Sequence, residues 1–128
     1  LDELRTLQAG VRDVYVDPGL VSYAVSLATA TREPASVGLP ELAELVAYGA
    51  SPRGPISLIQ AARALALVHG RDYVIPADVR ALVKDAFRHR LVLTYQALAE
   101  ERAADDVLDA VIAATPQPRL ELGRPAAA

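Results

Sequence analysis

Cysteine, methionine and tryptophan are absent from this sequence of 128 residues, and aromatic residues make up only 5% of it. Without cysteine the chain can form neither disulfides nor thiolate metal sites, which favours an intracellular, cytoplasmic location. Methionine is missing even at position 1, which favours a piece of a longer protein. No signal peptide opens the chain, and no apolar run approaches the roughly 20 residues of a membrane span. We therefore expect no membrane partner.

Net positive charge is also missing, because the formal net charge is -3 and the pI is about 5.3. A mildly acidic surface attracts neither nucleic acid nor anionic lipid. We expect no general affinity for DNA, RNA or membranes.

What the chain does have is 52% hydrophobic residues, mainly Leu, Val, Ile and Ala, and 23% charged residues. This composition is typical of one globular domain, and the aliphatic palette suits packed helices. Apolar spacings of three and four residues predict an all-α fold, a small helical bundle of about five helices. We expect helices over 1–12, 18–32, a short one from 40, 56–69, 76–88 and 105–113.

Local signals refine these predictions. Asp17 before Pro18 is typical of a helix start, since it combines a capping carboxylate with a proline at the first helical position. Leu42, Leu45 and Val46 predict the apolar side of the short helix, and Gly49 predicts its left-handed terminator.

The central helix is expected to bury a stripe of Ile56, Ile59, Ala62 and Ala66, which Leu58, Leu65 and the neighbouring alanines widen. Short extended connectors are expected over 14–16, 71–75 and 91–93. We expect a helical domain over 1–115 and a disordered tail over 116–128, where Pro, Gly and Ala leave little to bury.

Motifs for self-contained catalysis are missing. The chain holds no G-x-x-x-x-G-K-[ST] phosphate loop, its sole lysine is Lys84, and no G-x-S-x-G elbow occurs. His69 and His89 each fall at the end of a predicted helix, where the macrodipole favours a cation. They lack partners at metal-ligand spacing, so we predict no metal site and no catalysis by the isolated chain.

Arg53 is the most informative charged residue. It falls in the first turn of the central helix, where a cation is disfavoured and unpaired N–H groups already attract anions. Ser51 is expected to cap this helix. Arg53 thus points either to an anion site or to a simple ion pair with Glu41 or Glu44.

A second candidate site is a basic set on and beyond the 76–88 helix. Its members are Arg80, Lys84, Arg88 and Arg90. The first three share one helical face, which indicates either a solvated surface with favourable C-terminal charge or a contact surface for an acidic neighbouring subunit or, less readily, DNA.

Three ordered stretches resemble the C-terminal lid of MoxR-type AAA+ ATPases. They are GASPRG at 49–54, ISLIQAARALALVHGRDYVIPADVRAL at 56–82 and FRHRLVLTYQAL at 87–98. The helix ending in TATR at 29–32 and the segment ADDVLDAVIAATP at 104–116 are similar too.

The resemblance implies a lid that closes over ATP, with Mg²⁺, held by an N-terminal AAA+ core domain. It implies that Arg53 is the "sensor 2" arginine near the γ-phosphate, on a loop shaped by Gly49, Ser51 and Pro52. It also implies homo-oligomeric, usually hexameric, rings with chaperone-like activity toward partners, including proteins with von Willebrand factor A domains.

Two departures from the family pattern lead to further expectations. The segment 34–48 is longer than in the simplest members, which predicts an extra short helix. Gly54 and Pro55 replace helix formers, which predicts that the central helix begins a residue or two later. The alternatives to a lid are a protein-interaction bundle or a DNA-binding module that uses the 76–90 segment.

Overall fold

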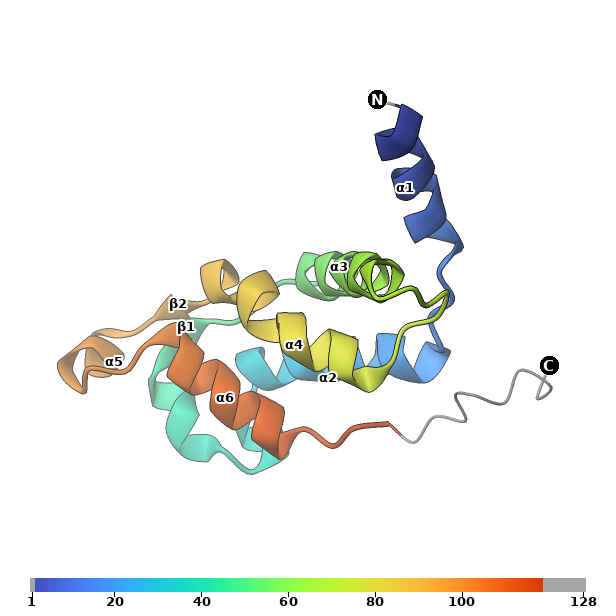
Figure 1. The fold of residues 1–128 in the computed structure, drawn as a ribbon. Helices are drawn as coiled ribbons and strands as arrows, with labels where there is room; N and C mark the ends of the chain where they lie inside the picture. The colour runs from blue at the N-terminus through green and yellow to red at the C-terminus, as the bar shows by residue number, and fades with distance from the viewer. Residues whose placement is uncertain (1, 119–128) are drawn as a thin grey trace.

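The chain folds into a helical bundle from which one helix projects, as seen in a computed structural model that describes residues 2–118 (Figure 1). The bundle contains α2 (Pro18–Arg32), α3 (Arg53–Val68), α4 (Pro76–Phe87) and α6 (Ala104–Ala114). The projecting helix is α1 (Asp2–Asp13), and α5 (Tyr95–Ala99) lies at the opposite end of the domain. Short 3-10 helices cover Pro34–Val37, Pro40–Glu44 and Arg88–Arg90. The all-α prediction is confirmed.

The core is aliphatic apart from Tyr23 and the chain's one phenylalanine, Phe87, which is fully buried. Its largest fully buried members come from all four bundle helices and from the segments that join them. They are Phe87, Leu20, Leu27, Leu42, Leu58, Leu108, Val74, Val79, Val83, Val107 and Val111. Burial of such side chains contributes about 1.5–3 kcal/mol each, so this cluster fixes how the four helices pack.

Helix starts follow the sequence signals closely. The Asp17 carboxylate accepts a hydrogen bond from the N–H of Gly19 at 2.7 Å, and Pro18 occupies the first turn of α2, as predicted. At α4 the carboxylate of Asp78 accepts from the N–H of Ile75 at 3.0 Å. These caps satisfy N–H groups that have no partner inside the helix.

The extended connectors are also where they were expected. Tyr15 and Tyr73 form a parallel bridge, with Tyr15 N–H donating to the carbonyl of Asp72 at 2.8 Å and Val74 N–H donating to that of Tyr15 at 2.9 Å. Strand β2 (Val92–Leu93) lies within the predicted 91–93 segment. The connectors therefore join the two halves of the chain at both ends of the bundle.

The short helix predicted from Pro40 to Gly49 is partly wrong. A 3-10 helix ends at Glu44, and the chain then forms β1 (Val46–Tyr48), which pairs antiparallel with β2. Gly49 is not a left-handed terminator, since positive φ among the glycines of residues 2–118 occurs at Gly38 and Gly70. This segment forms a strand and not a helix because β2, which is far away in the sequence, supplies hydrogen-bond partners for its backbone.

Two other differences concern single elements. Helix α5 was not predicted; it is capped by Thr94, whose hydroxyl accepts from Ala97 N–H at 3.3 Å. Ile56 was expected inside the core and is 60% exposed, whereas Leu58 on the same helix is fully buried. The buried face of α3 contains Leu58, Ile59, Ala62 and Ala66 as predicted, and Ile56 lies outside it.

No helix within residues 2–118 has the length and apolar character needed to cross a membrane. Of the predicted tail, residues 119–128 lie outside the described part of the chain.

Candidate functional site

Arg53 is the first residue of α3, and its side chain is exposed to solvent. Within residues 2–118 its guanidinium forms no ion pair and no hydrogen bond, so the alternative pairing with Glu41 or Glu44 does not occur. The carboxylate of Glu44 instead accepts from the side chain of Gln96 at 3.2 Å. Arg53 therefore presents an uncompensated positive charge at a helix N-terminus.

The predicted cap on this helix is present. The hydroxyl of Ser51 accepts from Arg53 N–H at 3.3 Å, and its carbonyl accepts from Gly54 N–H at 2.9 Å. The helix does not begin later than the motif, as had been expected; it begins at Arg53. Pro55 lies within the first four positions, whose N–H groups have no partner in the helix, so proline costs no hydrogen bond there.

Gly54 is needed for packing rather than flexibility. A Cβ atom at this position would lie 3.1 Å from Cε1 of Phe87 and 3.3 Å from Cβ of Ala50. Gly54 and Pro55 are both buried. The small residue lets the start of α3 approach Phe87 of α4 closely.

The loop before Arg53 is anchored to the end of α2. The N–H of Ala50 donates to the hydroxyl of Thr31 at 2.9 Å, and the carbonyl of Ala50 accepts from Nη1 of Arg32 at 2.7 Å. A Cβ atom on Gly49 would lie 2.6 Å from the backbone N of Arg32, so only glycine fits. These contacts were not predicted from the sequence, where the only sign of them was the TATR segment at 29–32, which contains Thr31 and Arg32.

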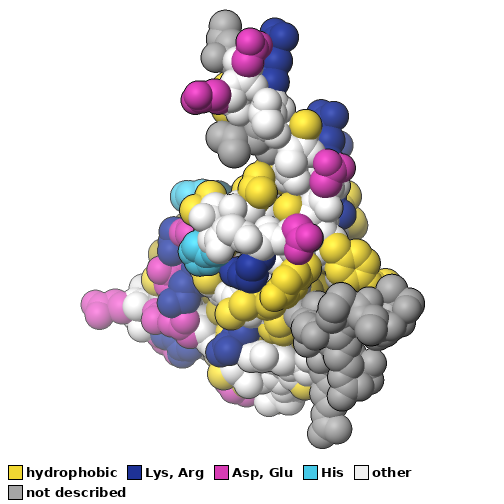
Figure 2. Space-filling model, turned by 45° about the vertical axis from the view of Figure 1, so that its right-hand side comes forward, with side chains coloured by type: hydrophobic (Ala, Val, Ile, Leu, Met, Phe, Trp, Pro, Cys, Tyr) yellow, Lys and Arg dark blue, Asp and Glu magenta, His cyan; other side chains and the backbone are white. Residues whose placement is uncertain are grey.

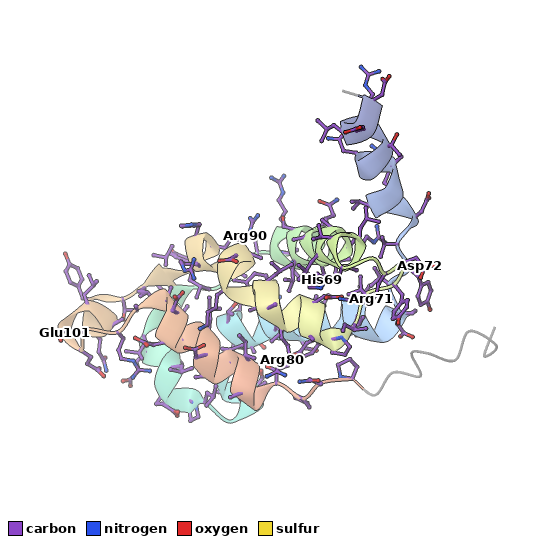
Figure 3. All side chains as sticks on the ribbon, viewed as in Figure 1. His69, Arg71, Asp72, Arg80, Arg90 and Glu101 are labelled. Carbon is purple, nitrogen blue, oxygen red and sulfur yellow. The ribbon has the colours of Figure 1, made fainter. Side chains whose placement is uncertain are left out.

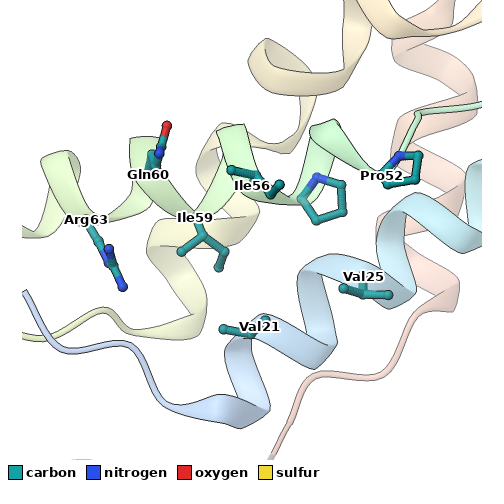
Figure 4. Close-up of a pocket in the computed structure, with 8 residues that line it drawn as sticks. Val21, Val25, Pro52, Ile56, Ile59, Gln60 and Arg63 are labelled. Atoms are coloured by element: carbon teal, nitrogen blue, oxygen red, sulfur yellow. The ribbon is translucent and has the colours of Figure 1, made fainter. Parts of the chain in front are cut away.

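An apolar groove of about 280 Å³ lies beside this site, between α2 and α3. Its lining residues are Val21, Val25, Pro52, Pro55, Ile56, Ile59, Gln60 and Arg63 (Figure 4). Arg53 precedes Ile56 by three residues and Gln60 by seven, spacings that share one side of a helix. The groove and the free arginine therefore lie on the same side of α3.

The basic set on α4 is largely neutralised within the domain. Lys84 pairs with Asp109 on α6 at 2.6 Å, and Arg88 pairs with Asp105 at 2.7 Å and with Asp85 at 3.3 Å. Hydrogen bonding to these carboxylates raises the pKa of both Lys84 and Arg88. Figure 2 shows that basic and acidic side chains lie next to one another along the left flank of the visible face.

The remaining two members of the set lie apart (Figure 3). Arg90 donates to the carbonyl of Ala86 and to the hydroxyl of Ser57, each at 3.0 Å. Arg80 lies near Tyr23, whose pKa is raised by burial and only partly lowered again by the arginine's charge. A DNA-binding module would need these residues as one open cationic face, and the pairing of Lys84 and Arg88 weakens that alternative.

His69 and His89 lie in different surroundings. The Nδ1 atom of His69 lies 3.2 Å from Nη2 of Arg71, next to the ion pair of Arg71 with Asp78 (Figure 3). His89 is exposed at the end of α4. Within residues 2–118 no three His, Cys, Asp or Glu side chains gather as metal ligands.

Comparisons of the sequence and of the structure with known proteins point to one family. The family model described as "AAA lid domain" matches residues 42–111. The protein named "Chaperone MoxR1" from Mycobacterium tuberculosis is 45% identical over 118 residues, which are 92% of this chain and 31% of that protein. "Protein MoxR" from Paracoccus denitrificans is 38% identical over 122 residues, covering 90% of this chain and 36% of the relative.

A solved structure is similar to this chain as well. A Cytophaga hutchinsonii protein described as an ATPase superposes with a TM-score of 0.84 at 32% identity, over 87% of this chain and 34% of that one. The chain thus spans about a third of the length of the proteins that it matches.

Proposed function

This chain belongs to the AAA lid domain family and is a lid domain of a MoxR-type AAA+ ATPase, and we propose that its Arg53 acts as the sensor 2 arginine. In this role the lid closes over ATP held by an AAA core domain, and the guanidinium contacts the γ-phosphate. The single observation that carries the proposal is the exposed guanidinium of Arg53, which has no partner within residues 2–118.

The local electrostatics support a phosphate ligand. Phosphoryl transfer spreads negative charge over the γ-phosphate oxygens, and a cation held in advance stabilises this charge at little reorganisation cost. Arginine can bridge two oxygens with parallel N–H groups, whereas lysine acts as a point charge. The dipole of α3, whose N-terminus lies at Arg53, adds a further partial positive charge.

The apolar groove between α2 and α3 supports a proposal about which side of the lid faces the core domain. Val21, Val25 and Ile56 are 44%, 45% and 60% exposed, which leaves apolar area in water on the side of α3 that carries Arg53. Apolar area of this kind gains from burial against another surface. We propose that this side faces the core domain and the bound nucleotide.

Magnesium and most of the phosphate contacts belong to the core domain in this proposal. The start of α3 offers the exposed Arg53 to a phosphate, and residues 2–118 offer no cluster of carboxylates to a cation. We therefore assign the γ-phosphate of ATP to Arg53, while Mg²⁺ needs oxygen ligands from the core domain. The isolated chain should bind ATP weakly or not at all.

The remaining expectations from the family concern the assembled machine. Membership of this family implies association with an AAA core domain and an oligomeric assembly. We propose a cytoplasmic homo-oligomeric ring, hexameric in size, that remodels or activates partner proteins, among them proteins with von Willebrand factor A domains. Arg80, Lys84, Arg88 and Arg90 stay a proposed subunit interface.

The test of the sensor role is Arg53→Ala in the full-length ATPase. We expect ATP hydrolysis to slow by at least about 10²-fold, on the scale of losing one positioned transition-state donor. The melting temperature of the isolated lid should stay unchanged, because the exposed side chain forms no hydrogen bond and no ion pair within residues 2–118. Arg102→Ala, at a partly exposed arginine three residues after the end of α5, is the matched control. Unchanged turnover in Arg53→Ala would remove the sensor assignment.

A further inference from the structure

We propose that Thr31 and Arg32, at the end of α2, are positioning residues that aim Arg53 at the nucleotide. This inference rests on the proposed sensor role of Arg53. It assigns a task to two side chains that form no hydrogen bond with Arg53 within residues 2–118 and that act through the backbone of Ala50.

Thr31 supplies one hydroxyl for two purposes. Its Oγ1 donates to the carbonyl of Ala28 at 2.6 Å and accepts from the N–H of Ala50 at 2.9 Å, and the residue is fully buried. A hydroxyl can donate and accept at once, whereas a valine of nearly the same shape can do neither. Replacing Thr31 by Val would leave the buried N–H of Ala50 without a partner.

Arg32 holds the other polar group of the same residue. Its Nη1 donates to the carbonyl of Ala50 at 2.7 Å. The N–H and C=O of Ala50 are thus both fixed to consecutive residues of α2, and Ala50 itself is fully buried. These two groups belong to the peptide units on either side of the Ala50 Cα, so the two anchors restrict the backbone rotation of Ala50 as well as its position.

Gly49 places the loop directly against the backbone of α2. Its Cα is so close to α2 that an added Cβ would lie 2.6 Å from both the carbonyl carbon of Thr31 and the N of Arg32. The loop therefore contacts the α2 backbone directly, with no layer of side chains between.

The anchor is close enough to Arg53 to set its direction. Ala50 precedes Arg53 by three residues, and an extended chain of that length spans at most about 11 Å. Between them, Pro52 has a fixed φ, and Ser51 accepts from the N–H groups of Arg53 and Gly54. A rotation of Ala50 would therefore shift the first turn of α3 and the guanidinium with it.

The test compares Thr31→Val, Thr31→Ser and Arg32→Gln in the full-length ATPase, with Ser26→Ala on the exposed side of α2 as the matched control. We expect Thr31→Val and Arg32→Gln to lower kcat by about 10- to 100-fold, since a misplacement of about 1 Å can cost this much. The KM for ATP should change less than threefold, because the core domain supplies most of the binding. Thr31→Ser keeps the hydroxyl and should retain wild-type turnover.

A double-variant experiment separates aiming from mere folding. If Thr31 and Arg32 act through Arg53, then Thr31→Val and Arg32→Gln should cause no further loss of kcat in an Arg53→Ala background. A purely structural role would lower turnover equally in both backgrounds, and that result would overturn the inference. Arg32→Gln changes an exposed side chain, so it stays informative if Thr31→Val fails to fold.

The two proposals fail in different ways. Unchanged turnover in Arg53→Ala counts against the sensor role itself. A slow Arg53→Ala enzyme combined with wild-type turnover in Arg32→Gln counts against the positioning role alone.

Discussion

Arg71 and Asp78 form a two-bond ion pair that links the turn after α3 to the first turn of α4. Nη1 of Arg71 lies 2.6 Å from Oδ2 of Asp78, and Nη2 lies 2.8 Å from Oδ1. The carboxylate side chain is only 3% exposed, and the guanidinium is 20% exposed. The same carboxylate caps α4 through the N–H of Ile75. One buried aspartate thus accepts three hydrogen bonds and links the turn after α3 to the first turn of α4.

Asp78→Ala should destabilise the isolated domain by about 3–5 kcal/mol, because it leaves a partly buried guanidinium uncompensated and removes the cap of α4. Urea unfolding followed by circular dichroism measures this difference. Asp72→Ala, at an exposed carboxylate in the same turn, is the control and should stay within about 0.5 kcal/mol of the parent. A loss below 1 kcal/mol for Asp78→Ala would show that the pair contributes little.

The same pair predicts how stability depends on pH. Burial acts to raise the pKa of Asp78, but the hydrogen bonds from Arg71 and Ile75 and the charges of Arg71 and His69 lower it below the ordinary value of 3.8. The unfolded chain therefore takes up the proton first as pH falls. The stabilisation is complete above about pH 4 and is lost as pH falls through the folded value. Unfolding free energies between pH 6 and pH 2 should show the gap between parent and Asp78→Asn narrowing below pH 4. A gap of equal size at both ends would contradict the pKa shift.

Helix positions were predictable from the sequence because their causes are local. Asp17 and Pro18 start α2 by capping and by backbone preference, and the apolar spacing around Val79 and Val83 fixes the buried side of α4. Such signals involve neighbours within one or two turns. The exposed position of Arg53 at a helix start was predictable for the same reason.

The features that escaped prediction depend on distant partners. Val46 has helical spacing from Leu42 and Leu45, yet it pairs with Leu93 as a strand. The anchor from Thr31 to Ala50 joins residues 19 apart. Gly49 has the residue type of a helix terminator but is required by close approach to α2. Nothing near these residues in the sequence specifies what they touch.

Gly49→Ala is expected to destabilise the domain strongly, because the new methyl group would overlap the backbone of Thr31 and Arg32. Overpacking of this kind costs about 1–3 kcal/mol or more, and the clash with backbone leaves no flexible side chain to yield. Gly10→Ala is the matched control, since its Cβ would contact only Leu67 at 3.4 Å. That change should stabilise α1 by up to about 1 kcal/mol through helix propensity. Thermal unfolding of both variants tests the contrast, and a Gly49→Ala domain as stable as its parent would show that the loop can move away from α2.

Ile56 offers a test of which side of the lid meets the core domain. It is 60% exposed in the α2–α3 groove, and Val68, on the same helix outside the groove, is 79% exposed. Exposed substitutions usually change stability by no more than about 0.5 kcal/mol, so Ile56→Ser and Val68→Ser should leave the melting temperature of the isolated lid nearly unchanged. In the full-length ATPase, however, a groove that faces the core domain would lose apolar contact only in Ile56→Ser. We therefore expect that variant alone to raise the KM for ATP or to slow turnover by severalfold, as measured by steady-state hydrolysis. Equal behaviour of the two variants would place the core domain on another side of α3.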